Sequence, residues 1–160
     1  MIAGTLLAES LVHAGFTHVV WIPDSHLGTW DDALALHPTL KLVRPCREGE
    51  AVAIAAGLMV GGAKPLVVIQ CTGFFEAGDA VRNTVHDLKL PLKMLVGVRN
   101  WNARATSADS CPPFIEPVVK AWNLPYTWFD PTAEHAADNL AQTIQPFASQ
   151  DHAGVLLWAE

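Results

Sequence analysis

Residues 65–70, PLVVIQ, form an unbroken apolar run of the kind found in parallel β-strands that are covered on both faces. Other short apolar runs alternate along the chain with segments whose apolar residues recur at helical spacing. This alternation predicts a single α/β domain over residues 1–160, with a three-layer α/β/α arrangement and a mostly parallel sheet of about six strands. The expected strands are residues 18–22, 40–45, 65–70, 91–98, 126–129 and 154–158, and the expected helices are residues 3–14, 25–37, 46–62, 76–88, 113–122 and 131–148.

Charge and the distribution of apolar residues exclude several classes of function. The net charge is −6 and no basic run is present, so we expect no nucleic-acid partner. Charged or polar residues interrupt every apolar segment before it reaches the roughly 18–20 residues of a membrane span, and the N-terminus has no signal-peptide pattern. Only 16% of the residues are charged, which favours a chain that hides part of its surface against a partner.

The three cysteines, Cys46, Cys71 and Cys111, lie far apart and form no CxxC pair. This spacing makes a zinc site and a disulfide framework unexpected, and it favours a reducing, cytoplasmic location. Cys71 directly follows the strand at 65–70 and could be a nucleophile on a turn. A GxSxG-type elbow would need a glycine where Ile69 stands, so a small apolar residue at a strand end is the alternative interpretation.

Ligands of open parallel sheets bind at the carboxyl ends of the strands. The segments expected there are residues 23–26, 46–50, 70–75 and 99–112. The phosphate-binding patterns GxGxxG and GxxxxGK[ST] are both absent, and the histidines are scattered without a metal-binding pattern. We therefore expect no metal site in this chain and no phosphate site that is complete without a partner.

Glu48 and Glu50 stand at the start of the expected helix 46–62, whose later residues are almost all small and apolar. The helix dipole favours acidic residues in a first turn, and this explanation suffices for Glu50. A carboxylate at the head of a buried helix of small residues is poorly solvated, which suits Glu48 to proton exchange near neutral pH. Arg44 and Arg47 flank this turn and either bind an anion or pair with nearby carboxylates.

The stretch from Glu48 to Gly57, EGEAVAIAAG, resembles the pyrimidine-binding domain of thiamine-diphosphate-dependent decarboxylases, in which a glutamate stands nine positions before a glycine. The most similar members are sulfopyruvate decarboxylase alpha subunits and the phosphonopyruvate decarboxylase group, over residues 1–130. The resemblance implies the thiamine-diphosphate-binding fold of the pyrimidine type. Further segments that carry the resemblance are 22–25 (IPDS), 65–73 (PLVVIQCTG), 78–81 (GDAV) and 90–97 (LPLKMLVG).

The resemblance also implies roles for individual residues. Glu48 would hydrogen-bond the N1′ atom of the cofactor's aminopyrimidine, which promotes removal of the proton at the thiazolium C2 atom. In the loop after the expected strand 65–70, which lines the pyrimidine pocket in the family, Phe74 and Phe75 stand where larger relatives have small residues. The positions implied to contact the cofactor are Glu48, Pro23, Thr72, Gly73 and Phe74.

Substrate contacts are implied for two further segments. Asp24 and Ser25 follow the first strand where relatives place a polar residue that faces the substrate, although both could instead cap the following helix. The loop after the fourth strand could clamp an acidic substrate group, or it could be an ordinary solvated loop. Its candidate residues are Arg99, Asn100, Trp101 and Arg104.

The chain lacks the GDG…N-type motif by which these enzymes hold the diphosphate through Mg²⁺. The resemblance therefore implies an alpha-type subunit that supplies Glu48 to a beta-type, diphosphate-binding partner, with self-association as well. The pair would decarboxylate a small anionic 2-keto acid such as 3-sulfopyruvate or 3-phosphonopyruvate. Two alternatives stay open: a non-catalytic binding or scaffold module of the same fold, and a Cys71-dependent hydrolase.

Overall fold

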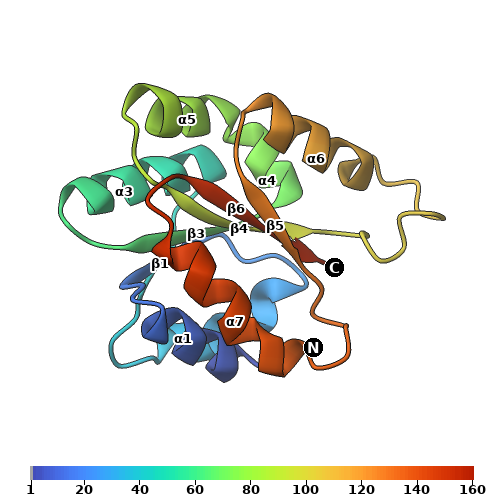
Figure 1. The fold of residues 1–160 in the computed structure, drawn as a ribbon, viewed down its shortest axis with the longest axis horizontal. Helices are drawn as coiled ribbons and strands as arrows, with labels where there is room; N and C mark the ends of the chain where they lie inside the picture. Colours follow the sequence, from blue (N-terminus) through green and yellow to red (C-terminus); the bar gives the residue numbers. More distant parts are fainter. Residues whose placement is uncertain (1) are drawn as a thin grey trace.

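A sheet of six parallel strands forms the centre of the molecule (Figure 1). The structure is a computed structural model that describes residues 2–160. The strands are β1 (His18–Trp21), β2 (Lys41–Val43), β3 (Pro65–Gln70), β4 (Lys93–Val98), β5 (Tyr126–Phe129) and β6 (Gly154–Ala159). Their order across the sheet is β2-β1-β3-β4-β6-β5, and every residue of β4 and β6 is buried. The prediction of about six mostly parallel strands is confirmed.

Helices cover both faces of the sheet (Figure 1). They are α1 (Gly4–His13), the 3-10 turn η1 (Leu27–Trp30), α2 (Asp31–Ala35), α3 (Glu48–Val60), α4 (Cys71–Glu76), α5 (Gly78–Arg82), the π-helical turn η2 (Asn83–Asp87), α6 (Cys111–Ala121) and α7 (Ala136–Ser149). One core lies between the sheet and α1, α2 and α7, and the other lies between the sheet and α3 to α6. The three-layer prediction is therefore confirmed. No helix within residues 2–160 has the length and apolar character that a membrane crossing requires.

The direction of the strand order reverses between β1 and β3. The chain runs from β1 outward to β2 and then returns to β3 on the other side of β1. In open α/β sheets such a reversal marks the place where ligands bind, at the carboxyl ends of the strands. In this chain α3 and α4 both begin at that end, because one follows β2 and the other follows β3.

Helix starts differ from the sequence predictions in several places. Of the two candidate caps after β1, Asp24 takes the role, because its Oδ1 atom accepts the backbone N–H groups of His26 and Leu27, both at 2.8 Å. The segment 71–75, expected as a turn, is helical and forms α4. Gly73 takes no left-handed conformation there, so the glycine does not interrupt the helix.

The last helix begins five residues later than predicted, at Ala136. The Oδ1 atom of Asp130 accepts the backbone N–H of Thr132 at 2.8 Å and its hydroxyl at 2.6 Å, which favours a turn after β5. His135 then has a left-handed conformation with a φ of 60°, so a regular helix starts only after it.

Candidate active site

Glu48 is the first residue of α3, and its side chain reaches across to α4. The carboxylate lies directly against the backbone of Gly73, where a β-carbon would be 2.5 Å from the carboxyl carbon. No side chain larger than hydrogen fits at position 73 while Glu48 keeps this orientation. The half-buried Glu48 side chain therefore lies against the backbone of α4 at this position.

Polar groups around Glu48 are engaged with one another. The Glu50 carboxylate lies in the first turn, where the helix dipole favours it, and reaches back to accept the backbone N–H of Cys46 at 2.7 Å. Arg44 pairs with Asp31, and Arg47 pairs with Glu76, so neither arginine is free to bind an anion. In contrast, the Glu48 carboxylate pairs with none of the described residues 2–160.

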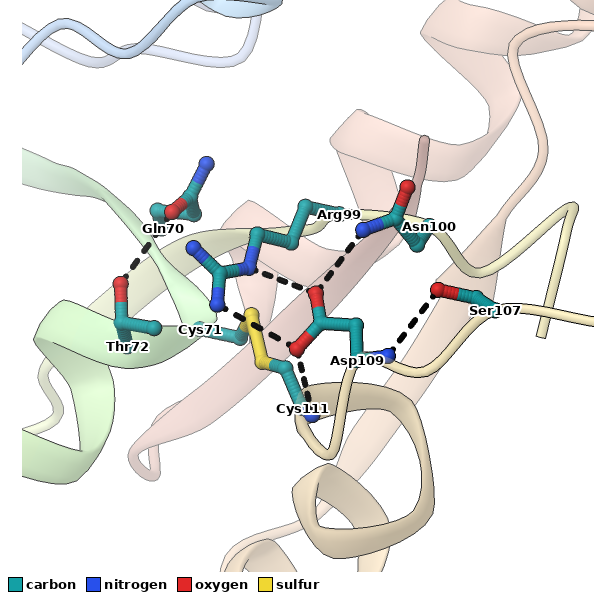
Figure 2. A network of polar contacts seen from close by, with 8 residues as sticks. All are labelled: Gln70, Cys71, Thr72, Arg99, Asn100, Ser107, Asp109 and Cys111. Carbon is teal, nitrogen blue, oxygen red and sulfur yellow. Dashed lines mark hydrogen bonds and ion pairs between the residues drawn. A yellow bond between two sulfur atoms is a disulfide. The ribbon is translucent and has the colours of Figure 1, made fainter.

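The predicted cofactor-binding residues at the start of α4 separate into two groups. Thr72 is exposed, and its hydroxyl donates a hydrogen bond to Oε1 of Gln70 at 3.1 Å (Figure 2). Phe74 is 2% exposed and packs in the core beneath α3 and α4, so its ring faces inward. The structure thus brings the half-buried Glu48 against the buried backbone of Gly73, with the exposed Thr72 beside them.

The segment 99–110 forms a loop, as predicted, and Arg99 anchors its base (Figure 2). The Arg99 guanidinium donates two hydrogen bonds to the Asp109 carboxylate, at 2.7 and 3.2 Å, and Asn100 donates a third at 2.9 Å. Asp109 also accepts the backbone N–H of Cys111 at 3.0 Å. The Arg99 guanidinium lowers the pKa of Asp109 to about 2, and the bonds from Cys111 and Asn100 contribute.

Aromatic stacking fixes the tip of the same loop. The ring of Trp101 stacks on that of Trp128 with 3.8 Å between the ring centroids. The guanidinium of Arg104 lies over Trp101, 4.3 Å from the ring centroid. Arg99, Trp101 and Arg104, which the sequence suggested as a substrate clamp, are all engaged in contacts within the chain.

Cys71 and Cys111 form a disulfide that joins the start of α4 to the start of α6 (Figure 2). The expectation of three separate thiols is therefore wrong. Sequence spacing could not reveal the bond, since the two cysteines are 40 residues apart and meet only because β3 and β4 are neighbours. Cys71 is also fully buried, so a hydrolase that uses its thiolate as the nucleophile is excluded.

Two further carboxyl groups lie at the same end of the sheet: that of Asp24, which the sequence suggested as a substrate contact, and that of Glu160, which was not predicted. Both carboxyl oxygens of Glu160, after β6, are buried without a hydrogen-bond partner, as is Oδ2 of Asp24. Burial raises the pKa of Glu160 to about 8, and the nearby Asp24 carboxylate adds to this increase. The only signal in the sequence was the position of Glu160 at the carboxyl end of an apolar run.

A cavity of about 320 Å³ adjoins Glu160 on the face that α1 and α7 cover. Its walls are mostly apolar and aromatic, and they include Trp30 and Trp158. Ser25 and Pro23 are exposed on the loop after β1 and do not line this cavity. The remaining lining residues are Ile2, His26, Leu27, Asn102, Pro131, Thr132, Ala159 and Glu160.

The geometry at Glu48 fits the aminopyrimidine ring that the resemblance implies. A flat heteroaromatic ring needs a carboxylate within reach of its ring nitrogen and backbone that it can approach closely. Glu48 supplies an unpaired carboxylate, and the missing β-carbon of Gly73 leaves the space in which this carboxylate lies against the backbone. No group of three or more His, Cys, Asp or Glu side chains within residues 2–160 could hold a metal ion.

Comparisons with known sequences identify the family of the chain. The family model described as "Thiamine pyrophosphate enzyme, N-terminal TPP binding domain" matches residues 1–110. A phosphonopyruvate decarboxylase of Streptomyces viridochromogenes is 27% identical over 109 residues, which are 68% of this chain and 27% of the relative. That of Streptomyces hygroscopicus is 25% identical over 109 residues, or 68% of this chain and 26% of the relative. The chain thus spans about a quarter of the length of these curated relatives.

Solved structures of thiamine-diphosphate enzymes share the fold over 99% of this chain and 30% of their own length. The 4-hydroxybenzoylformate decarboxylase of Rhodococcus jostii RHA1 has a TM-score of 0.68, and the benzoylformate decarboxylase of Polynucleobacter necessarius has 0.70, both at 19% identity. Because the family model covers more than half of the chain, this protein belongs to the thiamine pyrophosphate enzymes and carries their N-terminal thiamine-pyrophosphate-binding domain.

Proposed function

We propose that this chain is an alpha-type subunit of a thiamine-diphosphate-dependent 2-keto acid decarboxylase and that Glu48 activates the cofactor's aminopyrimidine. The observation that carries the proposal is the unpaired Glu48 carboxylate at the head of α3, against the bare backbone of Gly73. Glu48 would share a proton with a ring nitrogen placed beside Gly73, and Thr72 would border the same ring. Thiamine diphosphate, when bound, supplies the electron sink for the loss of CO₂.

The rest of the cofactor would be held by a beta-type partner subunit that binds the diphosphate through Mg²⁺. Two facts support this division. The matched family model is that of an N-terminal domain. Residues 2–160 also contain no group of acidic or histidine side chains suited to a metal ion. Self-association of the complex is part of the same proposal.

The proposed substrate is a small anionic 2-keto acid, with 3-phosphonopyruvate and 3-sulfopyruvate as the leading candidates. Support comes from the two curated relatives, which are both phosphonopyruvate decarboxylases. Within this chain Arg44, Arg47 and Arg99 are paired with carboxylates, and the guanidinium of Arg104 lies over the ring of Trp101. The cation that binds the phosphonate or sulfonate group would therefore come from the partner subunit.

The test is CO₂ release from a panel of 2-keto acids by the co-expressed complex, with Mg²⁺ and thiamine diphosphate. Glu48→Gln should reduce the rate by about 10²–10⁴-fold, the usual contribution of a positioned acid–base group. Glu50→Gln is the matched control, because its amide oxygen can still accept the Cys46 N–H. A Glu48→Gln complex with wild-type activity would overturn the mechanism. A complex inactive on every acid would favour the non-catalytic binding module.

A further inference from the structure

We infer that Glu76 is a positioning residue for Glu48 and that it fixes the start of α3 against α4. The inference rests on the proposed function for the role of Glu48, and it assigns the residue that holds Glu48 in place. Glu76 is the last residue of α4, and its carboxylate contacts both residues that flank Glu48 in the sequence.

Each oxygen of the Glu76 carboxylate accepts a hydrogen bond from one of the two residues next to Glu48 in the sequence. Oε1 accepts a hydrogen bond from the guanidinium of Arg47, and Oε2 accepts the backbone N–H of Gly49 at 3.0 Å. The Arg47 hydrogen bond lowers the pKa of Glu76, with a smaller contribution from Gly49, so Glu76 is ionised near neutral pH. The residues before and after Glu48 are thus bound to one carboxylate.

The register of α4 places this carboxylate next to the surface that Glu48 touches. Gly73 and Glu76 are three positions apart in α4, and residues at that spacing lie on the same face of a helix. Residues 47, 48 and 49 therefore dock on a single turn of α4, Glu48 through Gly73 and its neighbours through Glu76. A β-carbon built on Gly49 would lie 3.6 Å from Oε2 of Glu76, an ordinary van der Waals contact, so the hydrogen bond to Glu76 does not depend on glycine at position 49.

Among the described residues, Glu76 supplies the hydrogen-bond acceptor for the backbone N–H of Gly49 at the start of α3. Arg47 occupies the N-cap position in an extended conformation, and its side chain makes no capping hydrogen bond. The first N–H groups of a helix lack partners within the helix, so the acceptor for Gly49 has to come from elsewhere. Glu76 supplies it from the neighbouring helix.

Exposure of the ion pair indicates that its role is geometric. The Arg47 side chain is 70% exposed and that of Glu76 is 37% exposed, and ion pairs as exposed as this contribute little to stability. Without Glu76, the first turn of α3 would open more often, and Glu48 would spend less time against Gly73. Small displacements of a catalytic group lower the rate much more than they lower stability.

The experiment compares Glu76→Ala and Glu76→Gln with Asp79→Asn in the same chain. Asp79 is an exposed carboxylate on the next helix that pairs with Arg82, so it serves as the matched control. The first readout is amide hydrogen exchange of Gly49, followed by NMR in the chain alone. Exchange should become at least about 10-fold faster in Glu76→Ala, because the N–H loses its acceptor. It should stay near wild type in Asp79→Asn. Glu76→Gln should fall between them, since its amide oxygen can still accept.

The second readout is the kinetics of the reconstituted complex. Glu76→Ala should lower kcat by about 10-fold and leave KM for the 2-keto acid within about 3-fold, because binding groups are untouched. Unchanged Gly49 exchange, or an unchanged kcat in a complex that Glu48→Gln inactivates, would overturn the positioning role and leave the proposed function standing. If Glu48→Gln is active, the proposed function fails instead, and the exchange experiment still decides whether Glu76 holds the helix start.

Discussion

Gly73 leaves no room for a side chain opposite Glu48. A β-carbon there would lie 2.5 Å from the carboxyl carbon of Glu48, so Gly73→Ala must displace the carboxylate. We expect at least about a 10-fold loss of CO₂ release in the complex, because the acid–base group leaves its position. Thermal unfolding of the same variant shows whether the fold is intact.

Gly57→Ala is the control for the helix effect of an added methyl group. Nothing lies within 4 Å of a β-carbon at this position in α3. The variant should raise the free energy of unfolding by about 0.5–1 kcal/mol, the helix propensity gained from glycine to alanine. If Gly73→Ala has wild-type activity, the contact between Glu48 and Gly73 is not part of the site.

Burial of Glu160 makes the stability of this protein depend on pH. Its pKa is about 8 in the folded chain and close to the ordinary value of about 4.5 when unfolded, so the folded state binds more protons between these values. The free energy of unfolding should therefore fall as the pH rises from about 4.5 to about 8. Urea unfolding of wild type and Glu160→Gln at several pH values tests this. The free energy of unfolding of Glu160→Gln should not show this decline between pH 4.5 and 8. An equal decline with pH in wild type and variant would contradict the prediction.

Residues near one another in the sequence were easier to predict than residues that the sheet brings together. The role of Glu48 could be suspected because its helix, its small neighbours and Gly57 lie in one continuous stretch. Nothing in the sequence linked Glu160 to Asp24, since their proximity depends on the strand order. The sequence also could not decide whether Asp24 or Ser25 caps the segment after β1, because the answer depends on the backbone conformation of that turn.

At the scale of elements, the disulfide links α4 and α6 across the base of the loop 99–110. Its two cysteines are 40 residues apart, and closing a loop of that size stabilises a fold by roughly 3–4 kcal/mol in the chain-entropy description. Reduction should lower the free energy of unfolding by about that amount, measured by urea unfolding with and without a reductant. Cys46→Ser, made in both samples, prevents exchange with the free thiol. Equal stability in both states would contradict the prediction.

Strands were predicted well because their signal is local. A buried parallel strand is an uninterrupted apolar run, and the predicted 65–70 coincides with β3 (Pro65–Gln70). Helix starts were predicted less well where glycine was the cue. Gly73 suggested a turn, but in the structure it allows Glu48 to approach α4, which is a requirement of tertiary packing.

At the scale of the whole molecule, the chain holds only part of what the cofactor needs. Residues 2–160 have no metal-binding group, and Arg44, Arg47 and Arg99 are paired with carboxylates. We expect the chain alone to show no Mg²⁺-dependent binding of thiamine diphosphate in isothermal titration calorimetry. The complex with its partner should bind the cofactor. Tight Mg²⁺-dependent binding to the isolated chain would contradict the proposed division between subunits.

Cys46 is the free thiol among the described residues, and it is exposed two positions before Glu48. A thiol-reactive fluorophore attached there would sit beside the proposed cofactor ring without replacing any residue of the site. Its emission would change when another subunit covers the start of α3, or when that turn opens. The protein therefore carries a built-in attachment point for an optical assay of assembly, which can be read before any substrate is known.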